Sequence, residues 1–391
     1  GIIMEIEKMY SEKFNRVKSV MLKQQPDRVP VVPNMETYVY RYANVNLKEA
    51  LTNDVDLAVD AFKKTTKDIY LDAILGNSNI IPFKVMDLFG EGIYTITEKG
   101  LQIKGSHGMV LEPEDYPEFN KNVEDFLTNE IIRRKYPILN QSFEENKTLM
   151  IQALDGMNAF GSYNAKMNQR IKEEVGLPLL TKGSCYVASD IMLDYLRDFV
   201  GVSKDLRRHP NEFLEACNGI HKYVQKLLYE SYPTPQDGFV VFSPLHLPTF
   251  LKPKDFEKFY FPFMKRYIEE VSVKRGYTIL FFMENDWTPY LSILQDLPSN
   301  AKVIGLFEHG DLKTYKKQLG SKMVIMGGMP LNLLKTGTKE QCVDKAKQCL
   351  DDYAPDGNYI FSVDMVLMDT EDAKSENIIA AFDYIHENGK Y

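Results

Sequence analysis

Residues 278–286 read Thr-Ile-Leu-Phe-Phe-Met-Glu-Asn-Asp, and this stretch decides the fold class of the chain. Five large apolar residues follow one another from Ile279 to Met283 without a polar residue between them. Such a run is typical of a parallel strand that helices cover on both faces. The run stops at Glu284, and the ends of such strands form the active-site mouth of an α/β barrel. The pattern therefore predicts chemistry at Glu284.

The same arrangement of apolar run, polar residues and helical pattern repeats along the chain. Eight βα units indicate a (β/α)8 TIM barrel rather than a doubly wound sheet. No Gly-x-Gly-x-x-Gly or Walker pattern opens a helix, which argues against a nucleotide site. Asp27 and Arg28, just before the first strand, predict an ion pair at the base of the barrel. The expected strands are 29–32, 71–75, 177–181, 238–242, 278–283, 302–307, 322–326 and 359–362.

We expect residues 1–391 to form a single, distorted barrel domain with extra N-terminal helices, over 4–24 and 46–67. Alternating segments at 93–97, 101–104 and 109–111, split by glycine-containing turns, predict an inserted β-meander. Residues 112–176 read as a helical insertion. Within it, residues 155–162 (Asp-Gly-Met-Asn-Ala-Phe-Gly-Ser) predict a flexible loop, which fits either a lid over the mouth or a plain connection.

Composition excludes several classes of partner. The net charge is −8 and the sequence has no Lys/Arg cluster comparable to a nucleic-acid-binding surface, which argues against nucleic acid as a partner. No apolar run approaches the roughly 18–20 residues that span a bilayer, so no membrane association is expected. The N-terminus lacks the pattern of a signal peptide, and none of the four cysteines forms a zinc-type pair. These features predict a cytoplasmic protein without structural disulfides.

The candidate site consists of residues that follow the predicted strands at the mouth of the barrel. Carboxylates and imidazoles can donate or accept protons there, so we expect catalytic roles for Glu36, His246 and Glu284. Further polar, aromatic and glycine residues that follow the predicted strands are expected to contact the substrate. The aromatic residues among them favour a flat or apolar molecule. These expected substrate-binding residues are Asn34, Tyr38, Asn77, Asn79, Trp287, Gly327 and Asp364.

Three segments resemble stretches of the uroporphyrinogen decarboxylase superfamily. They are residues 26–31 (Pro-Asp-Arg-Val-Pro-Val), residues 327–330 (Gly-Gly-Met-Pro) with the following 333–340, and residues 373–381. The similarity is strongest over residues 238–388. The resemblance implies a distorted α/β barrel and one of two activities, which are porphyrin decarboxylation and methyl transfer to or from a corrinoid protein.

The second activity fits the residues better. Of the carboxylate-binding segment of the decarboxylase only Arg41-Tyr42 is retained, and the acidic Glu36 would repel a polyanionic porphyrin. Residues 242–246 (Phe-Ser-Pro-Leu-His) and 281–285 (Phe-Phe-Met-Glu-Asn) resemble a branch associated with corrinoid-linked demethylation, with Asn285 in place of a glycine. The resemblance implies transfer of a methyl group from a small methylated ether, amine or thioether to the cobalamin of a partner corrinoid protein. A homodimer is also expected, since dimers are common in the superfamily.

When the methyl group is transferred, the heteroatom that carried it is the leaving group. Two ways of activating this heteroatom fit the sequence. The thiol-alkylating methyltransferases of the superfamily bind zinc through a His-x-Cys-Gly segment and a second cysteine, and here Phe282, Glu284 and Asn285 occupy the first segment. Either Glu284, His246 and Glu308 hold a zinc ion, or they act as Brønsted acids without it. A lyase acting on a polycarboxylate and a non-catalytic barrel that has lost its metal are the alternative functions.

Overall fold

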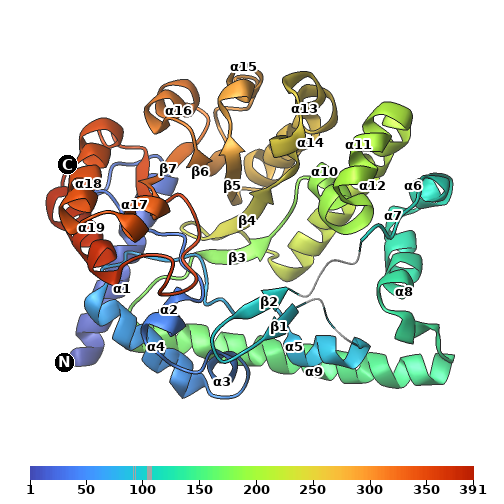
Figure 1. Cartoon of the computed structure of the whole chain (residues 1–391), viewed down its shortest axis with the longest axis horizontal. Coiled ribbons are helices and arrows are strands. Elements are labelled where there is room, and N and C mark those ends of the chain that lie inside the picture. The colour runs from blue at the N-terminus through green and yellow to red at the C-terminus, as the bar shows by residue number, and fades with distance from the viewer. Residues whose placement is uncertain (91, 93, 104–107) are drawn as a thin grey trace.

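A parallel sheet of six neighbouring strands forms most of the barrel wall (Figure 1). The computed structural model describes residues 1–90, 92, 94–103 and 108–391. Each strand pairs in parallel with the next one along the chain, as right-handed βα units require. The strands are β3 (Thr181–Ser184), β4 (Val240–Leu245), β5 (Thr278–Asp286), β6 (Lys302–His309), β7 (Val324–Met329) and β8 (Tyr359–Val363).

Two extended segments close this sheet into a ring. Val32 donates its backbone N–H to the Phe361 carbonyl of β8 at 2.9 Å, and Asp72 donates to the Val31 carbonyl at 2.9 Å. On the other side, Leu180 donates to the Ile74 carbonyl at 3.0 Å. The first segment is too irregular for a full strand because its prolines carry no N–H for a ladder. The predicted (β/α)8 barrel is confirmed, with residues 29–32 and 71–75 completing it among the described residues.

Side chains alternate between the inside and the outside of the ring. On β5, Leu280 and Phe282 belong to the interior cluster, whereas Phe281 and its neighbours pack under the helices. Helix α1 (Ile2–Met21) adds Val17, Val20 and Met21 to the same interior cluster and so seals one end of the barrel. By the same alternation, Glu284 is the next side chain of β5 to face the barrel axis, at the opposite end.

Helices surround the ring, as the sequence predicts (Figure 1). The expected helix over 46–67 is broken, because Asp54 accepts a hydrogen bond from the Leu57 amide and thereby caps a new helix. No described helix has both the length and the apolar character needed to cross a membrane. The helices that pack around the barrel are α2 (Tyr38–Tyr42), α3 (Leu47–Thr52), α4 (Val55–Asp68), α10 (Ala188–Ile191), α11 (Asp198–Arg208), α12 (Pro210–Ser231), α13 (Pro253–Phe259), α14 (Phe261–Tyr267), α15 (Leu291–Leu294), α16 (Leu312–Leu319), α17 (Leu331–Thr336), α18 (Lys339–Tyr353) and α19 (Ser375–Asn388).

The expected loop at residues 155–162 is wrong, because these residues lie inside α9 (Phe143–Arg170), the long helix along the lower side of Figure 1. Ser142 and Glu145 form a capping box that starts this helix. Gly156 reflects a close contact rather than flexibility, since a Cβ there would lie 2.7 Å from Cγ2 of Val85. The other helices of the insertion are α5 (Phe83–Met86), α6 (Tyr116–Lys121), α7 (Val123–Phe126) and α8 (Ile132–Lys135).

The expected β-meander is reduced to a hairpin among the described residues. Strands β1 (Tyr94–Ile96) and β2 (Leu101–Ile103) pair in antiparallel fashion, while the predicted strand ends Ile93 and Lys104 lie outside the described residues. Residues 109–111 are not a strand. The amides of Val110 and Leu111 instead donate to the carbonyl of Leu196, in a π-helical turn after α10.

Charged residues tie α1 to the base of the barrel. Arg16 on α1 reaches Asp27 at 2.8 Å and Asp72 at 2.6 Å, and Asp72 also accepts the amide hydrogen of Val31 at 2.8 Å. Asp27 additionally pairs with Arg28 at 2.9 Å, so the predicted ion pair is present. The Asp72 carboxylate is fully buried. Asp72 lies in segment 71–75 and contacts Arg16 of α1 and Val31 of segment 29–32, so it connects α1 to both segments that close the ring.

We expect Asp72→Ala to lower the free energy of unfolding by about 3–5 kcal/mol, since it leaves the buried Arg16 charge and the Val31 amide without their acceptor. Urea unfolding followed by circular dichroism measures this loss. Asp60→Ala, at an exposed position of α4, serves as the matched control and should change stability by less than about 0.5 kcal/mol. Equal effects of the two substitutions would contradict the proposed role of Asp72.

Candidate active site

His246 lies where β4 ends and is held between two carboxylates. Its Nδ1 lies 2.9 Å from Oδ2 of Asp194, in the π-helical turn after α10, and its Nε2 lies 2.9 Å from Oε1 of Glu284 on β5. All three side chains remain partly exposed, so this group is accessible from the mouth of the barrel. The structure therefore brings together two of the three predicted catalytic residues, His246 and Glu284.

A buried carboxylate positions the backbone below this group. Oδ1 of Asp190 accepts the amide hydrogens of His246 at 3.0 Å and Leu247 at 2.8 Å, and its Oδ2 accepts the hydroxyl of Tyr260. Burial raises the pKa of Asp190 to about 7. Asp190 and Asp194 are absent from the residues predicted from sequence. Their spacing of four positions on one helical face is the signal that could have found them.

The two carboxylates control the charge of the imidazole. Hydrogen bonding to Asp194, followed by that to Glu284, raises the pKa of His246 to about 10, against a smaller opposing effect of burial. At neutral pH the ring is therefore an imidazolium with both N–H groups donated to carboxylates. Such a group stores a proton at the mouth of the barrel.

Further carboxylates surround this ion group. Burial, together with repulsion from Glu284 and Asp364, raises the pKa of Glu308, while the nearby His309 opposes the shift. Nε2 of His309 lies 3.1 Å from Oε1 of Glu308. Asp364, after β8, accepts the amide hydrogen of Leu331 at 2.8 Å, and burial raises its pKa. The mouth is thus rich in carboxyl groups, which surround the imidazolium of His246.

Glu36 follows the first closing segment, and its backbone amide donates to the Leu367 carbonyl at 2.9 Å. Burial raises the pKa of its carboxyl group. Within the described residues this carboxyl group makes no hydrogen bond or ion pair and does not contact His246. Its catalytic role stays a prediction.

The expected zinc ligands Glu284, His246 and Glu308 are not arranged around a common point. Among residues 1–90, 92, 94–103 and 108–391, no three His, Cys, Asp or Glu side chains form a geometry that could hold a metal ion. Both nitrogens of His246 face carboxylates, so neither is directed at a metal shared with Glu308. The residues as placed do not fit the expected zinc site.

Three predicted substrate-binding residues make contacts that support the fold. Trp287 is completely buried and donates its indole N–H to the Glu284 carbonyl at 2.8 Å, which supports the site from behind. Asn77 donates to Asn164 and Asn168 of α9, so its amide anchors that helix. Gly327 is buried with φ near 142°, where a Cβ would lie 3.3 Å from the Phe307 carbonyl. Protein contacts account for the position of each of these residues, and their roles in substrate binding stay predictions.

Other expected contacts retain open hydrogen-bonding capacity. The Tyr38 hydroxyl and Nδ2 of Asn79 are buried without a hydrogen-bond partner among the described residues, and Asn34 is also buried. The hydroxyl of Ser362, which sequence reasoning missed, is likewise unpaired; it follows Ile360 on the inward face of β8. Buried polar groups are normally paired, so these atoms are candidates for ligand contacts.

Asn285 adopts a left-handed backbone conformation, with φ of 64°. Glycine and asparagine are the residues that tolerate this conformation best. Asn285 in place of a glycine therefore keeps a residue that tolerates this backbone conformation. Asparagine, like glycine, allows the backbone to turn directly after Glu284.

Comparison with known proteins supports this description. The family model "Uroporphyrinogen decarboxylase (URO-D)" matches residues 130–388. The chain belongs to the uroporphyrinogen decarboxylase family. The matched span contains Asp190, Asp194, His246, Glu284 and Glu308, so the ion group lies within the part that defines the family.

No curated protein matches the sequence. Among solved structures, the fold is similar to that of a methyltransferase from Methanosarcina mazei, with a TM-score of 0.60 and 14% sequence identity. The alignment covers 96% of this chain and 98% of the other. The likeness therefore extends over the whole barrel and its insertions, and it shows the fold.

We expect the imidazole of His246 to stay protonated until the pH approaches 10, and to titrate at lower pH in Asp194→Asn and Glu284→Gln. NMR titration of 15N-labelled histidine measures this directly. Because the pKa in the folded state exceeds the ordinary 6.5, the stabilisation that His246 gives is complete below pH 6.5 and is lost as the pH rises through about 10.

The destabilisation by His246→Gln should therefore be largest near pH 6 and should disappear above pH 10. His209→Gln, at the start of α12, controls for the loss of an imidazole elsewhere. A titration of His246 near 6.5 in the wild type would show that the carboxylates do not hold it.

Proposed function

We propose that the protein is a methyltransferase that moves a methyl group from a small methylated substrate to a corrinoid carried by a partner protein. The observation that carries this proposal is the imidazolium of His246, held between Asp194 and Glu284 at the mouth of the barrel. Family membership and a similar fold in a protein named as a methyltransferase support the reaction class.

The chemistry requires activation of the leaving atom. When bound, the corrinoid supplies the nucleophile that accepts the methyl group. The bond between the methyl carbon and the heteroatom breaks with its electron pair left on the heteroatom, and an alkoxide or amide formed this way is a poor leaving group. Proton donation to that atom as the bond breaks lowers the barrier.

His246 is the group placed to give this proton. Its Nε2–H faces Glu284, and a substrate heteroatom that takes the place of Oε1 would accept the same hydrogen. Asp194 keeps its contact with Nδ1 and so holds the ring in one orientation through the transfer. After donation the ring is neutral and recovers its proton from solvent. A pKa near 10 ensures that the ring carries the proton at neutral pH before the substrate binds.

The remaining mouth carboxylates select the substrate. Burial raises the pKa of Glu308 and of Asp364, so both carboxyl groups lie in surroundings that disfavour negative charge and favour a neutral substrate. We include Glu36 in this role because burial raises its pKa as well. A polycarboxylate would meet several carboxyl groups here, while His246 already pairs with two carboxylates and Arg41 lies 3.7 Å from Asp369. The alternative of a decarboxylase is therefore disfavoured.

We expect His246→Gln to lower the rate of methyl transfer by roughly 10²–10⁴-fold, since it removes the proton donor. Anisole, trimethylamine and dimethyl sulfide, each with chemically reduced cobalamin as the acceptor, provide a first panel of substrates. Formation of methylcobalamin is followed by its absorbance.

Glu284→Gln should also slow the reaction. His209→Gln, at the start of α12 and outside the His246 group, should not. Methyl transfer that is insensitive to both His246→Gln and Glu284→Gln would disprove the assignment of the site. Release of carbon dioxide from a polycarboxylate, in the absence of methyl transfer, would favour the lyase instead.

The pH profile distinguishes a proton donor from a merely structural histidine. A donor must be protonated, so kcat/KM should be constant at neutral pH and fall as the pH rises toward about 10. Asp194→Asn weakens the hold on the imidazolium and should move this fall to lower pH. The profile is measured at saturating acceptor. An unchanged profile in Asp194→Asn would contradict the role of Asp194 as a positioning residue.

A further inference from the structure

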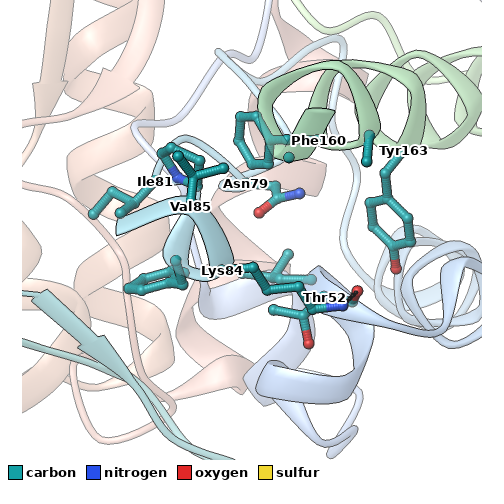
Figure 2. A pocket seen from close by; sticks show the side chains of 12 residues that line it. Thr52, Asn79, Ile81, Lys84, Val85, Phe160 and Tyr163 are labelled. Atoms are coloured by element: carbon teal, nitrogen blue, oxygen red, sulfur yellow. Dashed lines mark hydrogen bonds between the residues drawn. The ribbon is translucent and has the colours of Figure 1, made fainter. Parts of the chain in front are cut away.

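A cavity of about 210 Å³ lies between α9, α5 and α3, away from the His246 group. Figure 2 shows its lining, with Phe160 and Tyr163 on one side and Ile81 and Val85 on another. Most of the lining is apolar. Lys84 and Ala159 are exposed, which opens the cavity to solvent.

The polar atoms around this cavity are engaged elsewhere, with one exception. The Tyr163 hydroxyl donates to the Ala50 carbonyl at 2.5 Å, and the Thr52 hydroxyl donates to the Lys48 carbonyl at 2.5 Å. The charged group of Lys84 donates to the Thr52 carbonyl at 3.1 Å and to Oδ1 of Asn53 at 2.9 Å. These residues therefore present mainly hydrocarbon and ring surface to the cavity.

The exception is the side chain of Asn79. The residue is only 5% exposed, and its Nδ2 has no hydrogen-bond partner among the described residues. In Figure 2 the amide lies among the lining residues, with its nitrogen turned toward the side of Tyr163. Its backbone is fixed, because the amide N–H donates to Asn77 and the carbonyl accepts from Asn164 of α9. A buried donor without a partner beside an apolar cavity is a costly arrangement, and a ligand toward which the amide turns would supply the missing acceptor.

We infer that this cavity binds a small, uncharged, single-ring molecule that carries one hydrogen-bond acceptor, with the acceptor facing Nδ2 of Asn79. The volume sets the size, since an apolar cavity of about 150 Å³ is enough to hold benzene. Phe160 and Tyr163 offer ring surfaces for stacking or edge contacts. None of the lining residues belongs to the His246 group, although Asn79 is also one of the residues expected to contact the substrate. The inference concerns binding alone, so it is tested without a corrinoid and independently of methyl transfer.

Acetophenone and isopropylbenzene test this inference as a matched pair, because they differ mainly in the carbonyl oxygen. We expect acetophenone to bind the full chain roughly three- to tenfold more tightly than isopropylbenzene, as one net hydrogen bond allows. Titration calorimetry measures both affinities. Asn79→Leu should remove the preference while retaining the binding of isopropylbenzene, and Asn158→Leu, on the exposed face of α9, should change neither.

Ala159→Phe should fill the mouth of the cavity and weaken both ligands at least tenfold. Ala165→Phe, exposed on the same helix, is its matched control. Methyl NMR of the wild type locates the ligand without any substitution, and acetophenone should shift the signals of Val85 and Ala159. Absence of binding, shifts confined to other methyl groups, or a preference that survives Asn79→Leu in the folded variant would each overturn the inference.

Discussion

Parallel hydrogen bonding between β4, β5 and β6 fixes the level at which each strand ends, and the site depends on that register. Met283 lies between Leu245 on one side and Phe307 on the other. The residues that directly follow these three lie near the carboxyl ends of their strands and supply an imidazole and two carboxylates. They are His246, Glu284 and Glu308. A slip of one residue in any strand would turn its charged group outward, into the helix layer.

Electrostatic balance then determines what the mouth can do. Asp194 and Glu284 stabilise the positive form of His246 and so keep a proton available at the barrel opening. Asp190 contributes in a different way, because it accepts the backbone amides of His246 and Leu247 and does not contact the imidazole ring. The arrangement combines a fixed backbone with a partly exposed charged side chain, as a group that must both keep its orientation and meet a substrate requires.

Much of this fold could be predicted from sequence, because the C-terminal strands are continuous apolar runs with polar ends. Glu284 and His246 could be found for the same reason. Asp194 is harder to find, since its partner His246 lies 52 residues further along the chain and the sequence offers only the four-residue spacing from Asp190 as a signal. The burial of Trp287 and the contact of Asn77 with α9 could not be predicted, because residue type alone does not say whether an indole packs inward or whether an amide contacts a helix.

The order in which the ring closes has a consequence for biosynthesis. Val31, near the start of the chain, pairs with Phe361 of the last strand, and Val29 donates to the Gly389 carbonyl. A ribosome-bound chain therefore exposes an unpaired strand edge until its final segment has been made. Such edges are templates for aggregation, so the nascent protein should rely on chaperones or on rapid release more than a fold with locally paired strands would.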